Sequence, residues 1–207
     1  MSRIHGHTTP EVREAIIKLE DRVRSTIDMG DLLDLAQLYL EPAHRDDQAA
    51  AICELVLALD PGNSRAQVGV AYAAIHNEMT EAALRQAVDL LEEACDDPNA
   101  AGVANMLLAE ALEDLGELTA ERKTRLLELS VAAEPGWVAN RRRLARTYAQ
   151  LGRCEEAKQE MSMALRNLVP EDAYLSPLEE SFHTCFTGRT ESSAELTRER
   201  DQLCRQR

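Results

Sequence analysis

The chain has 207 residues, and its hydrophobic content of 44% is enough for one core or a short repeat array. Aromatic residues make up only 3%, and alanine and leucine dominate the apolar set, which argues against a β-sandwich because its strands need aromatic and β-branched side chains. The net charge of −14 at pH 7 argues against two function classes that need a basic surface, nonspecific nucleic-acid binding and binding to an anionic membrane.

The first region, residues 1–30, is predicted to contain a short leader and one helix. Residues 1–7 are followed by no apolar run, so we expect no secretory signal, and nowhere does the chain contain the roughly 20 apolar residues of a membrane span. We therefore expect a cytoplasmic location. Thr8 or Thr9 can cap a helix that carries Pro10 in its first turn. The helix has no repeat signature, so it is predicted to be an N-terminal cap or an extra packing helix.

From residue 31 onward, one two-helix pattern returns four times. Its first half has a large residue, a small one and a large one a turn later: Leu35-Ala36-x-x-Tyr39, Val68-Gly69-x-x-Tyr72, Leu108-Ala109-x-x-Leu112 and Leu144-Ala145-x-x-Tyr148. Its second half has a small residue followed by others four and seven positions later: Ala49, Cys53, Val56; Ala87, Leu91, Ala94; Ala157, Met161, Ala164. In the third copy Leu127 and Ser130 fit, but Lys123 stands where a small residue is expected.

Prolines close these units at regular intervals. Pro61, Pro98, Pro135 and Pro170 are separated by 37, 37 and 35 residues. They divide the chain into predicted units at 31–61, 62–98, 99–135 and 136–170. A helix pair of this size cannot bury its apolar face alone, so a period in the thirties indicates a helical solenoid in which neighbouring pairs stack.

The pattern over residues 30–170 resembles the tetratricopeptide repeat (TPR) family. Residues 59–63 (Leu-Asp-Pro-Gly-Asn) and 134–137 (Glu-Pro-Gly-Trp) are similar to the inter-repeat turn of that family, and residues 137–170 are the closest match. There are departures: the family period is about 34 residues, and His76 stands where a turn glycine is expected. The resemblance implies an all-α, right-handed helical solenoid of about four TPR-like pairs.

The last region, residues 171–207, is predicted to be a C-terminal capping pair. Residues 171–186 can form one helix with apolar side chains that include Leu178, and Gly188 ends it. Residues 192–207 then form a polar helix with a few apolar positions, among them Leu196. The end of a solenoid needs such a polar outer face for solubility.

The five cysteines predict no disulfide framework. They are odd in number, widely spaced and without a C-x-x-C motif: Cys53, Cys95, Cys154, Cys185 and Cys204. We expect free, buried thiols in a reducing compartment. Arg153 can lower the pKa of the neighbouring Cys154 thiol, so redox sensing at Cys154 is a weaker alternative.

Enzyme signatures are absent from the sequence. It contains no phosphate-binding glycine loop, no G-x-S-x-G and no H-E-x-x-H. His5 and His7 lie in the leader, and His183 and Cys185, two positions apart, point to different sides of a helix. We therefore predict a non-catalytic protein that has no cofactor and no metal site.

The densest cationic cluster, Arg141, Arg142, Arg143 and Arg146, lies in the fourth unit. The TPR resemblance implies that the first helix of each unit lines the concave face, with inward positions three before and one after the small residue of the signature. In the fourth unit these positions are Arg142 and Arg146, one helical turn apart, so both can reach one ligand group. The predicted peptide-binding groove comprises Gln37, Ala66, Val70, Ala73, Ala74, Met106, Glu110, Arg142 and Arg146.

These residues predict an adaptor or chaperone-like module that binds a partner peptide or helix. The partner would lie on an apolar floor and present an acidic residue or a C-terminal carboxylate to Arg142 and Arg146. The carboxylate clamp of some TPR proteins is incomplete here, because Leu33 and Gln37 replace its Lys and Asn.

Three alternatives remain open at this point. The arginines can instead pair with Glu110, Glu113 or Asp114 and only link repeats. The chain can be a structural self-assembly module that pairs through its terminal helices, or a chaperone of bacterial secretion. The sequence does not predict the oligomeric state.

Overall fold

The computed structural model of the chain describes residues 9–40, 43, 45–77, 80–168, 176, 178 and 192–204. Several predictions lie outside these residues. They are the leader with its two histidines, the closing Pro170 and, apart from Ser176 and Leu178, the helix predicted over residues 171–186.

The described part of the chain contains ten α-helices and no strand. The helices are α1 (Pro10–Ser25), α2 (Met29–Leu40), α3 (Asp46–Leu59), α4 (Ser64–Asn77), α5 (Glu81–Ala94), α6 (Ala101–Asp114), α7 (Ala120–Ala133), α8 (Val138–Gln150), α9 (Cys154–Arg166) and α11 (Ser193–Gln202). The predicted N-terminal helix begins at Pro10, where the Thr9 side chain accepts a hydrogen bond from the Val12 amide.

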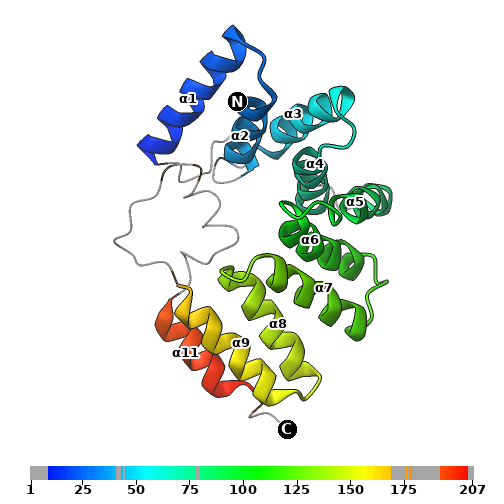
Figure 1. Cartoon of the computed structure of the whole chain (residues 1–207), viewed down its shortest axis with the longest axis vertical. Helices are drawn as coiled ribbons and strands as arrows, with labels where there is room; N and C mark the ends of the chain where they lie inside the picture. Colours follow the sequence, from blue (N-terminus) through cyan, green and yellow to red (C-terminus); the bar gives the residue numbers. More distant parts are fainter. Residues whose placement is uncertain are drawn as a thin grey trace.

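Helices α2 to α9 form four antiparallel pairs that follow one another along an arc (Figure 1). Each helix packs against its neighbours in sequence, and α2, α4 and α6 also contact one another in series. Helix α1 packs on α2 at one end of the arc, and α11 packs on α9 at the other. The predicted all-α solenoid of four helix pairs with an N-terminal helix is confirmed.

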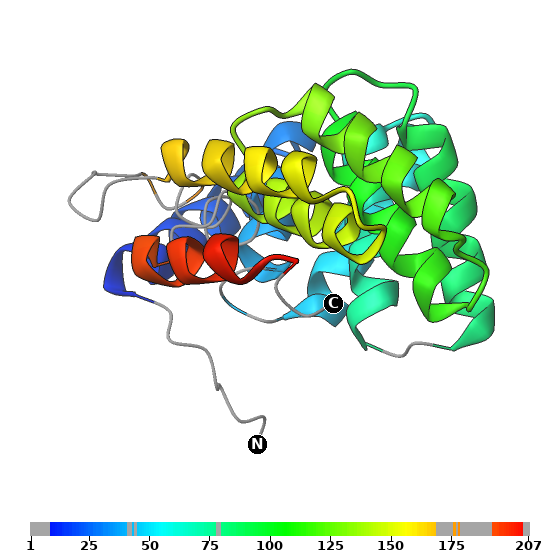
Figure 2. The ribbon, with the colours of Figure 1, turned by 90° about the horizontal axis from the view of Figure 1, so that it is seen from below.

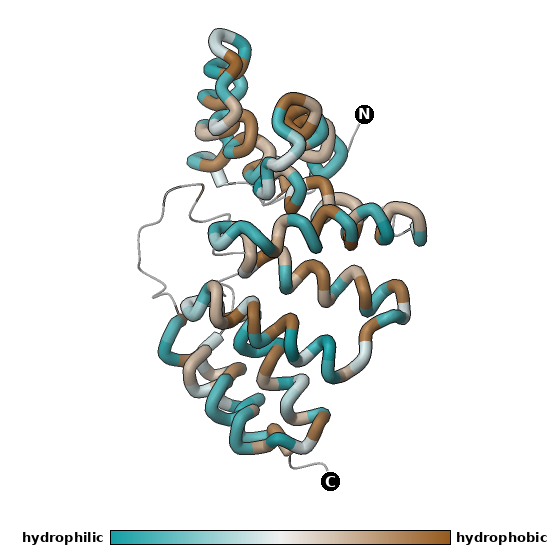
Figure 3. The backbone as a smooth tube through the Cα atoms, turned by 45° about the vertical axis from the view of Figure 1, so that its right-hand side comes forward, coloured by the Kyte–Doolittle hydropathy of each residue, from teal (hydrophilic) through white to brown (hydrophobic). Residues whose placement is uncertain are grey.

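The repeat signature is buried where the paired helices meet. The second-half positions in α3, α5 and α9 are all buried, and so are Leu127 and Ser130 in the weak third copy. Gly69 of α4 lies so close to α3 that a Cβ added to it would overlap the Cys53 sulfur. In Figure 3 polar and apolar residues are interspersed along the helices, as expected for amphipathic packing.

Glycines and threonines define the turns within the pairs. Gly116 and Gly152 have φ of 71° and 79°, a left-handed conformation that favours glycine, and they end α6 and α8. Thr80 and Thr119 cap α5 and α7 by accepting backbone hydrogen bonds. In the second unit α4 continues through His76 to Asn77, so this residue lies in the helix and takes no part as a turn residue.

Helix α11 runs antiparallel to α9 at the C-terminal end of the arc (Figure 2). Leu196 is its one buried residue and packs among Val138 and Ala145 of α8 and Met161 and Ala164 of α9. No helix within the described ranges is both long and apolar enough to cross a bilayer.

Candidate functional site

The arginine cluster of α8 divides into three different environments. Arg141 is buried, donates a hydrogen bond of 2.7 Å to the Pro135 carbonyl, and pairs with Glu160 of α9 at 2.5 Å. It therefore fixes the inter-repeat turn onto the fourth pair. Arg143 points to the preceding unit, where it pairs with Glu110 of α6 at 2.9 Å.

Arg142 and Arg146 together hold one carboxylate, that of Glu199 in α11. Arg142 Nε lies 2.7 Å from Glu199 Oε2, and Arg146 Nε lies 2.5 Å from Oε1. A third hydrogen bond, 3.2 Å long, joins Arg146 to Glu199 Oε2. Side-chain exposure is 24% for Arg142, 50% for Arg146 and 20% for Glu199, so the site is partly shielded from water.

The charge of Glu199 responds to this environment. Burial alone would raise the pKa of Glu199, but the hydrogen bonds and charges of Arg146 and Arg142 outweigh burial and lower it. The carboxylate therefore stays ionised, and the two guanidinium groups neutralise this negatively charged residue of α11.

Sequence reasoning placed Arg142 and Arg146 one turn apart but missed their partner. The sequence allowed pairings of these two arginines with Glu110, Glu113 or Asp114, but the carboxylate that lies between them is that of Glu199, and Glu110 pairs with Arg143. Glu113 instead accepts hydrogen bonds from Lys123 of α7, the shorter at 2.6 Å. Glu199 is 53 and 57 residues away in sequence, in a helix without repeat signature, so no local pattern identified it.

The predicted groove floor consists of small and apolar side chains that are mostly buried. Ala66, Val70, Ala73 and Met106 are buried in this structure, while Ala74 is half-buried. Ala66 and Val70 belong to the core cluster at the N-terminal end of the arc.

Gln37 of α2 contacts Leu178, which lies beside that core cluster. Its side-chain amide donates a hydrogen bond of 3.4 Å to the carbonyl of Leu178, and the Leu178 side chain packs against the same cluster. Part of the chain's own C-terminal region thus contacts the first unit.

Two of the five cysteines form a disulfide, which corrects the prediction of free thiols for this pair. Cys154 at the start of α9 is bonded to Cys204, just beyond α11, with their Cα atoms 6.0 Å apart. The two are 50 residues apart in sequence and meet only because α11 runs back along α9, so their spacing gave no signal. The idea of an activated Cys154 thiolate does not apply to this bonded form.

Cys53 and Cys95 are free thiols, as predicted, and Cys53 is buried as expected whereas Cys95 is only half-buried. Burial raises the pKa of both to about 11, so they are poor nucleophiles near neutral pH. Within the described ranges, no group of three or more His, Cys, Asp or Glu side chains is placed to hold a metal ion.

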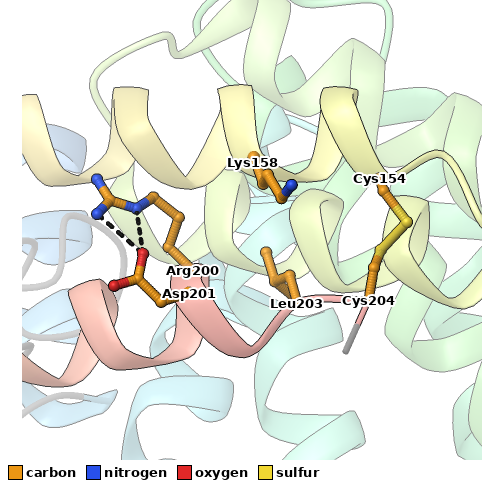
Figure 4. Close-up of a pocket in the computed structure, with 6 residues that line it drawn as sticks. All are labelled: Cys154, Lys158, Arg200, Asp201, Leu203 and Cys204. Atoms are coloured by element: carbon orange, nitrogen blue, oxygen red, sulfur yellow. Dashed lines mark hydrogen bonds and ion pairs between the residues drawn. A yellow bond between two sulfur atoms is a disulfide. The ribbon is translucent and has the colours of Figure 1, made fainter. Parts of the chain in front are cut away.

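The disulfide borders an open pocket of about 540 Å³ between α9 and α11 (Figure 4). Its lining is Cys154 and Lys158 from α9, and Arg200, Asp201, Leu203 and Cys204 from α11 and its C-terminal end. Arg200 pairs with Asp201 at 3.0 Å. The disulfide therefore borders an open cleft whose charged side chains are Lys158, Arg200 and Asp201.

Comparison with known proteins identifies the fold and leaves the role open. No family model matches the sequence, and no curated protein is similar to it. Among solved structures, the chain is similar to TTC0263, a thermophilic TPR protein of Thermus thermophilus, with a TM-score of 0.64 and 17% identity over 93% of this chain and 90% of that one.

Two further structures are similar along most of their length. YrrB, described as a TPR protein with an unusual peptide-binding site, has a TM-score of 0.52 and 17% identity over 89% of this chain and 91% of that one. PilW, a type IV pilus biogenesis factor, has a TM-score of 0.59 and 16% identity over 92% and 83%. At these identities the likeness establishes the fold.

Proposed function

We propose that this tetratricopeptide-repeat fold serves as a non-catalytic binding module, an adaptor or chaperone-like protein that holds a segment of a partner protein. Structural likeness to YrrB, a TPR protein described as having a peptide-binding site, is consistent with this role. The fold itself supplies extended, stacked helices whose inner surface suits a peptide or helix.

The observation that carries the proposal is the way α8 and α9 hold α11. Leu196 is fully buried against the fourth pair, and the Glu199 carboxylate lies between Arg142 and Arg146. An apolar anchor and a charge-assisted contact are the two elements by which helices are recognised in grooves. The chain's own helix thus illustrates the chemistry of a partner segment that would bind here.

From the Arg142–Arg146 end of the arc, the partner would extend along the other predicted groove residues. Glu110, Met106, Ala74, Ala73, Val70, Ala66 and Gln37 lie on α6, α4 and α2, the first helices of the preceding units. Because Gln37 already contacts Leu178, a partner would compete with the chain's own C-terminal region along this path.

The cytoplasmic location predicted from the sequence is kept as a proposal. A disulfide is usual in oxidising compartments, and in the cytosol it is normally transient. The Cys154–Cys204 bond therefore makes the redox state of the purified native protein informative about location.

The test is affinity capture from the native host with the wild-type chain and with Arg142→Glu/Arg146→Glu. We expect a partner that binds the wild type to lose at least ten-fold in affinity for the double variant. The matched control is Arg122→Glu/Arg125→Glu on α7, where both arginines are largely exposed. Equal affinity for all three proteins would reject the arginine pair as part of the binding site.

A further inference from the structure

We propose that the Cys154–Cys204 disulfide locks α11 onto the fourth helix pair, and that its reduction uncovers the Arg142–Arg146 site for a partner helix carrying a leucine and, three residues later, a carboxylate. This inference rests on the proposed binding function and adds to it a partner chemistry and a means of control.

Helix α11 is held by few contacts other than the disulfide. It has ten residues and buries only Leu196, whereas the other described helices bury three or more residues each. Its N-cap residue, Ser192, makes no side-chain capping hydrogen bond. A helix this short is marginal in isolation, so its position depends on the anchor leucine, the Glu199 ion pairs and the covalent link to α9.

The disulfide lies where it controls this position most directly. It joins the first residue of α9 to Cys204, two residues beyond the end of α11. Cys204 has a φ of 66° and is the one non-glycine residue with positive φ in the described ranges. This left-handed conformation is unfavourable for an L-residue with a side chain. Reduction would allow the backbone at Cys204 to relax away from it.

The bond is also accessible to a reductant. It borders the 540 Å³ pocket in which Lys158 and Arg200 are found (Figure 4). Lys158 pairs with Glu155 and Arg200 with Asp201, so it is access through this open pocket, rather than a free positive charge, that favours thiol–disulfide exchange here. Cys53 is buried and offers no comparable site.

The chemical step is a two-electron exchange with a dithiol, either a small molecule or a protein dithiol. One thiolate of the reductant attacks a sulfur of the Cys154–Cys204 bond, and the other protein sulfur leaves as a thiolate and takes up a proton. The second thiol of the reductant then resolves the mixed disulfide. The products are two protein thiols and one oxidised reductant, so atoms and electrons balance.

Release of α11 would expose the surface that Leu196 and Glu199 now occupy, and these two side chains indicate what a partner helix must present there. Val138, Ala145, Met161 and Ala164 form the seat of Leu196, and Arg142 and Arg146 flank Glu199. Leucine and glutamate three residues apart lie on one face of a helix, so a partner helix with this spacing matches both features.

The experiment uses the full chain and a fluorescent synthetic peptide with the sequence of residues 192–203. Peptide binding is measured by fluorescence anisotropy with oxidised protein and after reduction by dithiothreitol. We expect at least ten-fold tighter binding to the reduced protein. The Cys204→Ser protein should bind like the reduced wild type with or without dithiothreitol, and a peptide with Glu199→Gln should bind several-fold more weakly.

Hydrogen exchange of residues 193–202 separates the two parts of the inference. Faster exchange after reduction, together with tighter peptide binding, is the expected result. Unchanged exchange and equal peptide affinity in all three protein forms would overturn the lock and leave the proposed binding function standing. Faster exchange without any peptide binding would overturn the binding site and leave the lock.

Discussion

At the scale of single residues, the contact between Gly69 and Cys53 sets how closely the first and second helix pairs approach. A Cβ at position 69 would lie closer to the Cys53 sulfur than packed atoms tolerate. We expect Gly69→Ala to lower the free energy of unfolding by about 1–2 kcal/mol, because overpacking outweighs the gain in helix propensity. Urea unfolding followed by circular dichroism measures this change.

Two variants test whether the sulfur is the cause. Cys53→Ala removes it, so the Cys53→Ala/Gly69→Ala protein should be more stable than the sum of the single effects predicts. Gly62→Ala is the matched control, since no atom lies within 4 Å of a Cβ at that position. Strict additivity of the two substitutions would contradict the proposed contact.

A buried hydrogen-bond chain makes Ser130 a second sensitive residue. Its hydroxyl donates to the Gly102 carbonyl at 2.7 Å and accepts from the Asn140 amide at 2.6 Å, which links α7 to α6 and α8. Ser130→Ala leaves both partners without this contact in a buried interface, so we expect a loss of about 1–3 kcal/mol in unfolding free energy. Ser162→Ala on the exposed side of α9 should cost much less, and equal losses would contradict this account.

At the scale of helices, two tyrosines join neighbouring elements in the same way. Tyr39 of α2 donates a hydrogen bond to Glu20 of α1, and Tyr148 of α8 donates one to Glu128 of α7. An arginine side chain lies over each ring, Arg45 at 5.0 Å and Arg153 at 4.2 Å from the centroid. Helix α1 therefore packs on α2 as the second helix of a unit packs on the unit that follows.

The sequence explains why this role of α1 was not predicted. Its buried residues Val12, Ile16 and Leu19 have the spacing of the second-half signature, four and then three positions apart. Valine replaces the small residue that begins the signature elsewhere, so the pattern predicted only a packing helix. Periodicity and proline spacing sufficed for the four pairs, because those signals lie within 40 residues of sequence.

The contacts that complete the candidate site could not be predicted from periodicity or proline spacing. Arg142 and Arg146 were predicted from their place in the repeat. Glu199, in contrast, lies in α11, a polar helix with one buried leucine, and Cys204 lies just beyond the end of that helix. Hydrophobic periodicity cannot place such a helix, because one buried leucine forms no periodic apolar face, and an ion pair and a disulfide help to set its position.

The paired tyrosines also predict a titration. Burial, followed by the hydrogen bonds to Glu20 and Glu128, raises the pKa of both Tyr39 and Tyr148 to about 12. Their contribution to stability is present below pH 10, the pKa of an unfolded tyrosine being about 10, and is lost as pH rises towards 12. Absorbance at 295 nm should show Tyr39 and Tyr148 ionising at a higher pH in the native protein than in urea, where tyrosines ionise near pH 10. Tyr148→Phe should remove one late step, and a native titration identical to that in urea would contradict the assignment.

At the scale of the whole molecule, the solenoid transmits little from one end to the other. Successive units are joined by the packing of adjacent helices, and ion pairs between units such as Arg65–Asp34, Arg122–Glu92 and Arg143–Glu110 are partly exposed and therefore add little. Contacts between described helices are largely limited to neighbours in the series. Stability is then close to a sum of local terms, and each end can open without the centre.

Removing the anchor of α11 tests this locality. Leu196 is fully buried against α8 and α9, so Leu196→Ala should loosen α11 and cost about 2–5 kcal/mol of local stability. Hydrogen exchange followed by mass spectrometry should show faster exchange in α8, α9 and α11, while α4 and α5 keep the protection of the wild type. Leu129→Ala, at a partly exposed position of α7, is the matched leucine deletion and should change neither region. Faster exchange throughout the chain in Leu196→Ala would mean that the solenoid opens as one cooperative unit, in which case release of α11 would expose far more than the Arg142–Arg146 site.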